Sequence, residues 1–170
     1  METLKNIFEE ETRNVFNTPL EIGLRTLFLL DSMSPNHYDL NTLVIFDYFL
    51  LNSGDFPGGP ESLHPVTPHR GAQLIIKPMI MQKGLNLMIS KELININFGQ
   101  GGITYSSNIL TKKFIEFIDT DYSKSLISIC SWIKSEFSNY DIKKLELFVK
   151  NNIPDWGSEF IYESLIRENV

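Results

Sequence analysis

Apolar residues recur every three to four positions through the first third of the chain, which is the spacing of a helix that packs on one side. The first helix is expected to begin after Thr18, because this N-cap is followed by a proline and then, three residues after the cap, by Glu21, which forms a capping box. Pro35 marks its end. A second helix is expected over residues 39–52, with Asp39 as its N-cap. It has little polar surface, so we expect it to be buried or to form half of an interface.

A β-hairpin is predicted in the middle of the chain, where the apolar period changes to two. Residues 93–98 alternate apolar and polar side chains, residues 99–102 form a glycine-rich turn, and residues 103–107 return as a second strand.

Further helices are predicted on both sides of this hairpin. The helix before it restarts after Thr67 and runs to Ile89, and Pro78 is expected to kink it or to split it in two. Helical spacing after the hairpin predicts four more helices, at residues 109–118, 122–137, 141–149 and from Pro154 onward.

The order of these elements is that of a winged helix-turn-helix: two helices, a long loop, a third helix, a tight hairpin and another helix. We therefore expect a mainly α protein with a small β-hairpin. A winged-helix-like domain is expected over residues 18–120, with its wing at 93–107. An N-terminal arm at 1–17 precedes it, and C-terminal helices at 121–170 extend it and pack on it. Because many α+β domains contain one hairpin, the pattern leaves other folds open.

A long loop over residues 53–69 interrupts the helical pattern. It holds three glycines and four prolines in 17 residues. Loops of this length without regular structure are uncommon in compact domains and are often functional. Prolines restrict φ, and Phe56, Leu63 and Val66 provide apolar anchors, so we expect a stiff loop. A disordered excursion is the alternative.

The composition indicates one folded globular domain. The 170 residues carry 15 Lys and Arg against 21 Asp and Glu, for a net charge of −6, and 42% of them are apolar, which excludes a disordered chain. The acidic balance argues against a protein that coats nucleic acid with a whole basic surface. The charge is −5 over residues 1–52, +3 over 53–113 and −4 over 114–170. The middle third therefore has a positive bias, although stretches this short also differ in charge by chance.

No targeting or membrane segment is visible in the sequence. The first eleven residues carry one lysine and four glutamates, and they lack the basic start and apolar run of a signal peptide. No apolar run approaches the ~20 residues that a membrane span needs. The single cysteine, Cys130, excludes an internal disulfide framework and favours a reducing compartment. We therefore expect a cytoplasmic protein without a membrane partner.

The candidate chemical residues do not form a recognisable active site. His64 and His69 are a candidate metal pair that Asp55 and Glu61 could complete. Zinc sites need three or four ligands, and the sequence holds no Cys-x-x-Cys or His-Glu-x-x-His, so hydrogen bonds within the loop are the preferred role. Cys130 lies on an apolar helical stripe and is expected to be a buried structural thiol. We expect no enzyme activity and no cofactor.

DNA binding is one function that a winged helix offers. The third helix of such proteins enters the major groove, and the wing contacts the backbone. Lys77 and Lys83 lie on the expected third helix, but the wing tip at 99–102 has no charge, and phosphate contacts supply most of the affinity. Operator binding is therefore weakly supported, and a winged helix that docks proteins is at least as well supported.

His69 and Arg70 stand at the expected start of the third helix. A helix N-terminus favours anions, so Arg70 is a candidate to hold a phosphate or a partner's carboxylate. The alternative, which we prefer, is that Arg70 pairs with Asp55 or Glu61 and braces the loop.

Several segments together resemble one protein family. They are Asn17-Thr-Pro-Leu-Glu-Ile-Gly-Leu-Arg25, Tyr38-Asp-Leu40, Asp47-Tyr48 and, above all, Ser53-Gly-Asp-x-x-Gly-Gly-Pro-Glu-Ser-Leu-His-Pro-x-Thr-Pro-His-Arg70. They are similar to the middle component of bacterial ABC-three-component systems, whose operons resemble and overlap with Lamassu-type anti-phage and anti-plasmid defence. The resemblance runs from about Asn17 to Phe137 and covers the helices after Ser138 less clearly.

The resemblance implies a function that composition does not show. It implies a non-catalytic scaffold or regulatory subunit beside a large SMC/Rad50-like ATPase and an effector, often a nuclease. Such a subunit would bridge the ATPase and hold the effector inactive until foreign DNA is sensed, and DNA contact would occur within the complex. The family provides no catalytic residues to carry over. The runner-up is a winged-helix DNA-binding transcription regulator, and a metal-dependent hydrolase built on His64, His69 and Asp55 is a third option.

We predict that the loop and the helix after it contribute an interaction surface. The candidate residues are Asp55, Gly58, Gly59, Glu61, His64, His69, Arg70, Lys77 and Lys83. The apolar helix at 39–52 is a further candidate interface.

Overall fold

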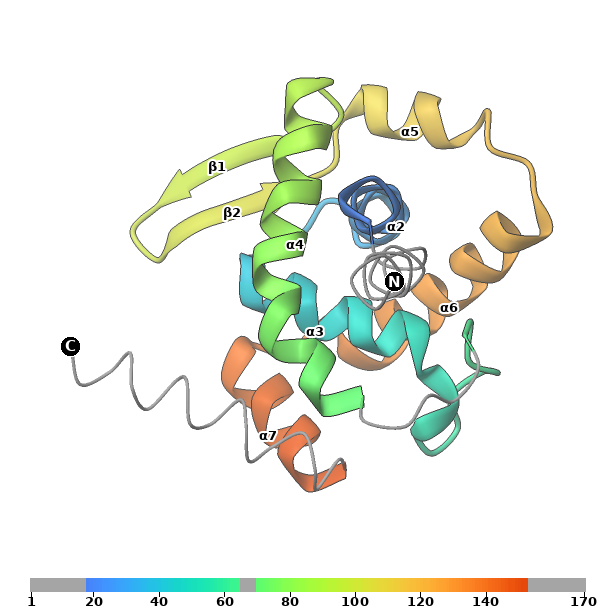
Figure 1. Cartoon of the computed structure of the whole chain (residues 1–170). Helices are drawn as coiled ribbons and strands as arrows, with labels where there is room; N and C mark the ends of the chain where they lie inside the picture. Colours follow the sequence, from blue (N-terminus) through green and yellow to red (C-terminus); the bar gives the residue numbers. More distant parts are fainter. Residues whose placement is uncertain (1–17, 65–69, 153–170) are drawn as a thin grey trace, which may run out of the picture.

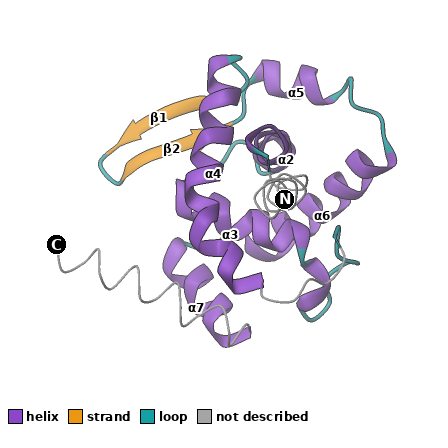
Figure 2. Cartoon of the chain, viewed as in Figure 1, coloured by secondary structure: helices purple, strands orange, loops and turns teal. Residues whose placement is uncertain are grey.

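The computed structural model describes residues 18–64 and 70–152, which form a mainly helical protein with one two-stranded antiparallel sheet (Figures 1 and 2). The elements in chain order are α2 (Pro19–Ser32), α3 (Leu40–Leu51), the short 3₁₀ helix η1 (Ser53–Asp55), α4 (Arg70–Ser90), β1 (Asn95–Gly99), β2 (Gly102–Ser106), α5 (Ile109–Ile115), α6 (Asp121–Phe137) and α7 (Ile142–Asn152). The predicted mainly α fold class with one small hairpin is confirmed. Among these helices, none has both the length and the apolar character needed to cross a membrane.

Helices α2 and α3 begin where the sequence predicts, and through the expected caps. Thr18 Oγ1 accepts a hydrogen bond from the backbone N–H of Glu21 at 3.2 Å, and Asp39 Oδ1 accepts one from that of Thr42 at 2.7 Å. The Glu21 carboxylate accepts a hydrogen bond from Arg25 Nη1, a charged donor one turn along the helix, at 2.9 Å. Its predicted return to the backbone of Thr18 stays a prediction.

Helix α3 is the centre of the hydrophobic core. All residues from Thr42 to Leu51 are buried, and the helix contacts α2, α4, α6 and α7. An all-round apolar helix is stable only when other elements surround it in this way. Of the two roles predicted for residues 39–52, burial is confirmed, and the apolar surface of this helix is not available as an interface.

An aromatic cluster joins α3 to the C-terminal helices. The ring of Phe49 on α3 lies 4.7 Å, between centroids, from both Phe56 of the loop and Phe137 of α6. Phe148 of α7 lies 5.6 Å from Phe56 and 5.0 Å from Phe137. Ring pairs at these separations add to the stabilisation that their buried area already provides. Helices α6 and α7 therefore share the core of the helices that precede the hairpin.

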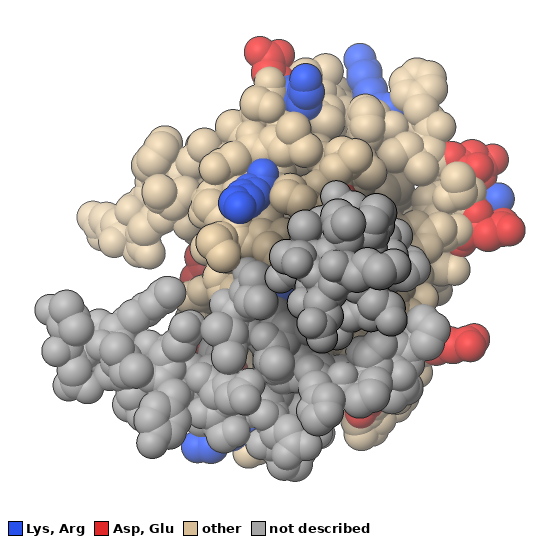
Figure 3. All heavy atoms as spheres, in the orientation of Figure 1, with Lys and Arg blue, Asp and Glu red and all other residues tan. Residues whose placement is uncertain are grey.

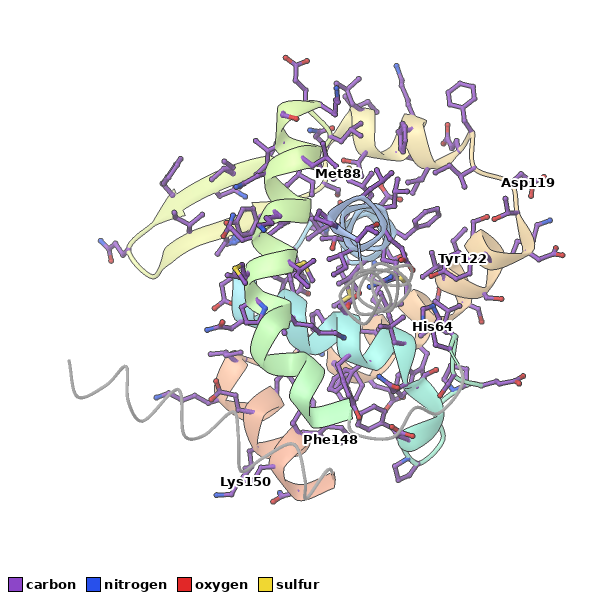
Figure 4. All side chains as sticks on the ribbon, viewed as in Figure 1. His64, Met88, Asp119, Tyr122, Phe148 and Lys150 are labelled. Carbon is purple, nitrogen blue, oxygen red and sulfur yellow. The ribbon has the colours of Figure 1, made fainter. Side chains whose placement is uncertain are left out.

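Helices α2 and α4 approach each other closely at two glycines; Figure 1 shows α2 end-on, beside the long α4. A Cβ added to Gly84 of α4 would lie 2.7 Å from the carbonyl oxygen of Pro19, and one added to Gly23 of α2 would lie 2.7 Å from Met88 Cε. Met88 fills the space beside this contact (Figure 4). At Gly84 the obstacle is backbone of α2 and cannot move aside, whereas at Gly23 it is the end of the flexible Met88 side chain. Gly84 is therefore the position where the two helix backbones are in direct contact.

The predicted hairpin is present and follows α4 directly. Its register pairs Ile96 with Tyr105 and Phe98 with Ile103, and it closes at the pair Gly99–Gly102. Gly102 has a φ of +109°, which favours glycine at the end of this tight turn. The hairpin extends away from the helices beyond its base (Figure 1).

Several other sequence predictions are tested only in part. Helix α4 runs unbroken from Arg70 to Ser90 with Pro78 inside it, so the predicted split is wrong. The element order matches the expected winged helix, but that assignment stays a prediction. The N-terminal arm at 1–17, the loop end at 65–69 and the helix expected from Pro154 lie outside the described residues.

The glycine contact between α2 and α4 gives a first prediction. We expect Gly84→Ala to lower the free energy of unfolding by about 1–3 kcal/mol, as overpacking does. This loss would occur although alanine favours a helix over glycine by about 1 kcal/mol. Denaturant unfolding measures it. The matched control is Gly101→Ala in the hairpin turn, where an added Cβ meets nothing within 4 Å. Equal stability of the two variants would show that the helices tolerate a wider spacing.

Candidate functional site

Three charged side chains from three helices meet inside the fold, and we call them the charge cluster: Arg25 of α2, Asp47 of α3 and Lys77 of α4. Arg25 donates to Asp47 through Nε at 2.8 Å and through Nη2 at 3.2 Å, which is a two-pronged guanidinium–carboxylate pair. Lys77 Nζ lies 3.2 Å from the second oxygen of Asp47. The same ammonium lies 5.8 Å from the centre of the Tyr48 ring. One carboxylate therefore ties α2, α3 and α4 together.

The charge cluster is almost completely shielded from water. The exposed fraction is 1% for Arg25, 1% for Asp47 and 5% for Lys77. Burial by itself would raise the pKa of Asp47, but Arg25 and, after it, Lys77 outweigh burial and hold that pKa at about 2. Burial lowers the pKa of Lys77, and nearby Arg25 lowers it further, against the opposite effect of Asp47. Asp47 therefore stays ionised between two cations at any ordinary pH.

The charge cluster reaches the surface through Glu21, Tyr122 and His64. Glu21 binds Arg25, and burial raises its pKa. Burial also raises the pKa of Tyr122 on α6, and the ring of this tyrosine lies 6.5 Å from that of His64 (Figure 4). Burial and then the positive charge of Arg25 lower the pKa of His64. Glu21 supplies a second negative charge beside Arg25, so the cluster and Glu21 together carry two positive and two negative charges.

The described part of the loop, residues 53–64, is folded over this region by its own hydrogen bonds. The hydroxyl of Ser53, which is fully buried, donates to the carbonyl of Glu61 at 3.1 Å. The hydroxyl of Ser62 accepts a hydrogen bond from the N–H of Gly54 at 3.0 Å. A Cβ on Gly59 would lie 2.0 Å from the Ser53 carbonyl oxygen, so this close approach requires glycine. The two ends of the loop segment are thus held side by side.

Two further contacts attach the loop to α3. Phe56 is only 4% exposed and belongs to the aromatic cluster described above. The Tyr48 hydroxyl donates to Asp55 Oδ2 at 3.3 Å. Tyr48 therefore contacts the charge cluster with its ring, through Lys77, and the loop with its hydroxyl. The apolar anchor predicted for Phe56 is confirmed.

The structure separates the residues predicted for the interaction surface. Asp55, Gly58 and Glu61 are exposed in the loop, and Lys83 is exposed on α4. Gly59 is half-buried and packs on Ser53, and His64 is half-buried beside Tyr122. Lys77 lies in the core and not on the surface, because Asp47 needs a second cation there. His69 and the side chain of Arg70 lie outside what the structure describes, so the proposed pairing of Arg70 stays a prediction.

Other candidate chemistry is limited in the described residues. In residues 18–64 and 70–152 no three His, Cys, Asp or Glu side chains gather as a metal site would require. His69, half of the predicted metal pair, is not among these residues. Cys130 is fully buried, as predicted, and burial raises the pKa of its thiol to about 12.

Three residues that matter most for this arrangement were not predicted as site residues from the sequence: Arg25, Asp47 and Tyr122. One signal was available, since Asp47 is the single charged residue in the otherwise apolar helix α3. A lone carboxylate in such a helix must find a buried cation or pay a large desolvation cost. The segments that carry the family resemblance, around Thr18–Arg25, Asp47–Tyr48 and the loop, are brought together here by the fold.

Removal of the central carboxylate gives a second prediction. We expect Asp47→Asn to lower the free energy of unfolding by about 3–5 kcal/mol, because two cations are then left buried without a full counter-charge. The matched control is Asp119→Asn. Asp119 pairs with Lys124 at 2.9 Å, but both side chains are mostly exposed, so little loss is expected there. Urea unfolding measures the free energy of unfolding of both variants. A large loss only in Asp47→Asn shows that the buried carboxylate stabilises the fold, and equally small losses show that this ion pair is dispensable.

The pKa of Asp47 gives a third prediction. Its value of about 2 is below the ordinary 3.8, so the folded state favours the charged form. The resulting stabilisation, about 2 kcal/mol, is complete above pH 4 and is lost as the pH falls toward 2. We therefore expect the stability gap between the wild type and Asp47→Asn to narrow by about that amount from pH 5 to pH 2. A gap that stays constant over this range would contradict the assignment.

Comparison with known proteins assigns the family. Residues 15–159 match the family model of the ABC-three component (ABC-3C) system Middle Component 2. No curated protein and no solved structure matches the chain. The matched range contains the charge cluster, the loop, the hairpin and the C-terminal helices up to α7. The chain belongs to the ABC-3C Middle Component 2 family and is a component of a three-component defence system.

Proposed function

We propose that this chain is the non-catalytic scaffold and regulatory subunit of its ABC-3C complex. It bridges an SMC/Rad50-like ATPase and holds a nuclease-type effector in check until foreign DNA is sensed, as in Lamassu-type defence. The observation that carries the proposal is the match of most of the chain to a middle component, which implies partners in the system. The proposal places the protein in the cytoplasm with its DNA target.

Two groups of exposed apolar side chains support a bridging role. One, the α5 patch, consists of Ile109, Leu110, Phe114 and Phe117, of which Phe117 is 89% exposed. The other, the hairpin face, consists of Ile96, Phe98 and Ile103, of which Phe98 is 80% exposed. Exposed apolar groups of this kind mark interaction surfaces when they gather in one place. The hairpin and α5 extend to opposite sides of α4, so the two groups can meet different partners (Figure 1).

The loop offers a third, polar surface. The contacts of Ser53, Gly54 and Gly59 hold its shape, while Glu61 and Asp55 are exposed and Asp55 also accepts a hydrogen bond from Tyr48. A preorganised loop loses little conformational entropy when a partner binds it. This supports the predicted docking role of the loop.

The pairing of the buried charges supports a structural role over a catalytic one. A catalytic acid or base needs access to a substrate proton. Arg25 and Lys77 both pair with Asp47 in the core, and these ion pairs hold three helices together.

The alternative is a winged-helix DNA-binding regulator. The hairpin after α4 and the exposed Lys83 favour it. Two observations count against it: residues 95–106 contain no charged side chain, as the hairpin in Figure 3 shows, and Lys77 is bound to Asp47. Binding of the isolated chain to duplex DNA, measured at several salt concentrations, separates the two proposals. If the chain is a DNA-binding regulator, it binds tightly, its affinity falls steeply with salt, and Lys83→Glu reduces this salt dependence. If it is a scaffold, the isolated chain shows no such binding.

Co-purification gives the fourth prediction. We expect the tagged chain to retain the large ATPase encoded beside it when the two are co-expressed. Glu61→Lys should weaken this retention, because it reverses the charge of the loop surface. The hydrogen bond that Glu61 makes to Ser53 uses its backbone carbonyl, which the substitution keeps. The matched control is Glu136→Lys, the same charge reversal at an exposed position of α6. If the chain never retains the ATPase, the scaffold proposal is wrong. If both variants retain the ATPase equally, the loop surface is not part of the contact.

A further inference from the structure

One edge of the β-hairpin has no neighbour in the described part of the chain. The sheet has two strands, and the outer edge of β2 is occupied at Tyr105. There the N–H of Tyr38 donates to the Tyr105 carbonyl at 3.0 Å, and the N–H of Tyr105 donates to the Tyr38 carbonyl at 2.8 Å. In residues 18–64 and 70–152 no segment pairs in this way with β1. The open edge is therefore that of β1.

The register shows which backbone groups face the open edge. Tyr105 uses both its N–H and its carbonyl on Tyr38, so these groups point away from β1. In an antiparallel ladder the residue directly opposite behaves in the same way, and that residue is Ile96. Two positions along the strand the pattern repeats, at Phe98. The N–H and carbonyl groups of Ile96 and Phe98 are thus free to pair with another strand.

β1 lacks the features that usually keep an edge strand of a soluble protein from pairing with another chain. These features are lysine, proline and β-bulges. β1 has the sequence Asn-Ile-Asn-Phe-Gly and pairs with β2 without a bulge. Ile96, Phe98, Ile103 and Tyr105 share one face of the hairpin, because directly paired residues lie on the same side. Tyr105 is buried at the base, but Ile96 is 39%, Ile103 49% and Phe98 80% exposed. Both the edge and the face beside it are open.

We propose that the occupant of this edge is a second copy of the chain, paired antiparallel through β1 about a two-fold axis at Asn97. In this register Ile96 of each copy lies opposite Phe98 of the other. Each pair forms two backbone hydrogen bonds, so all four outward N–H and all four outward carbonyl groups are satisfied. The two hairpins become one four-stranded antiparallel sheet, and the contact is isologous.

Self-complementarity favours a second copy over a strand of another protein. Phe98 gains Ile96 of the other copy on one side and keeps Ile103 of its own hairpin on the other, so the apolar side chains form one continuous row. The hairpin, residues 95–106, is uncharged, so two chains that each carry a net charge of −6 meet where neither presents a charge. This inference does not depend on the scaffold proposal, and each can fail alone.

The oligomeric state of the purified full chain tests the proposal first, and this is the fifth prediction. Sedimentation equilibrium should show a dimer at micromolar concentration. Phe98→Lys should weaken the dimer by about tenfold or more, since lysine on an edge strand opposes pairing. Phe117→Lys is the matched control, because Phe117 is just as exposed but lies after α5, and it should leave the dimer unchanged. A chain that stays monomeric overturns the proposal. A monomeric chain whose β1 edge is bound by another protein is the same negative outcome.

Cross-linking tests the register independently of any loss of stability. In the proposed register the two Asn97 residues form a non-hydrogen-bonded pair with Cα atoms about 4.5 Å apart, within reach of a disulfide. Asn97→Cys should therefore form a covalent dimer on mild oxidation, and the buried Cys130 does not compete. The control is Gln100→Cys, whose two copies would lie roughly 20 Å apart along the seam. Equal cross-linking of both variants, or none of Asn97→Cys, rules out this pairing.

Discussion

The position of one carboxylate, Asp47, is the constraint on which the arrangement of the first three described helices depends. A charge in the middle of an apolar helix is tolerated only with cations beside it. Arg25 and Lys77 can reach it only when α2 and α4 pack against α3 in one orientation and register. Hydrophobic burial favours many arrangements of apolar helices, whereas this three-sided ion cluster favours one. The charge cluster thus adds specificity to a core whose stability comes mainly from apolar burial.

The tight spacing between α2 and α4 and the shape of the loop follow from this arrangement. Gly23 and Gly84 let the two helix backbones approach closely beside the charge cluster. Tyr48 then connects the cluster to the loop, and Phe56 connects the loop to the aromatic rings of α6 and α7. The loop is therefore attached to the core through Tyr48, which lies beside the charge cluster, and through Phe56.

The surfaces that remain open are of a different kind from this interior. The α5 patch and the hairpin face are apolar, while Asp55 and Glu61 of the loop are exposed. Separate open surfaces are consistent with the proposed scaffold role, in which each partner would have its own contact area. The uncharged edge of β1 adds a contact that is suited to another copy of the same chain.

The sequence by itself determined the local elements and the family. Caps at Thr18 and Asp39, the apolar run of α3 and the glycine turn at 99–102 act through neighbours in the chain, so their effects can be read without the fold. The tertiary structure alone decided which charges pair across the helices, because Arg25, Asp47 and Lys77 are distant in sequence and the local pair of Arg25 with Glu21 does not point to the other two. For the same reason Lys77 could be mistaken for a surface lysine. A buried salt bridge depends on the relative placement of whole helices, and no short-range pattern records that placement.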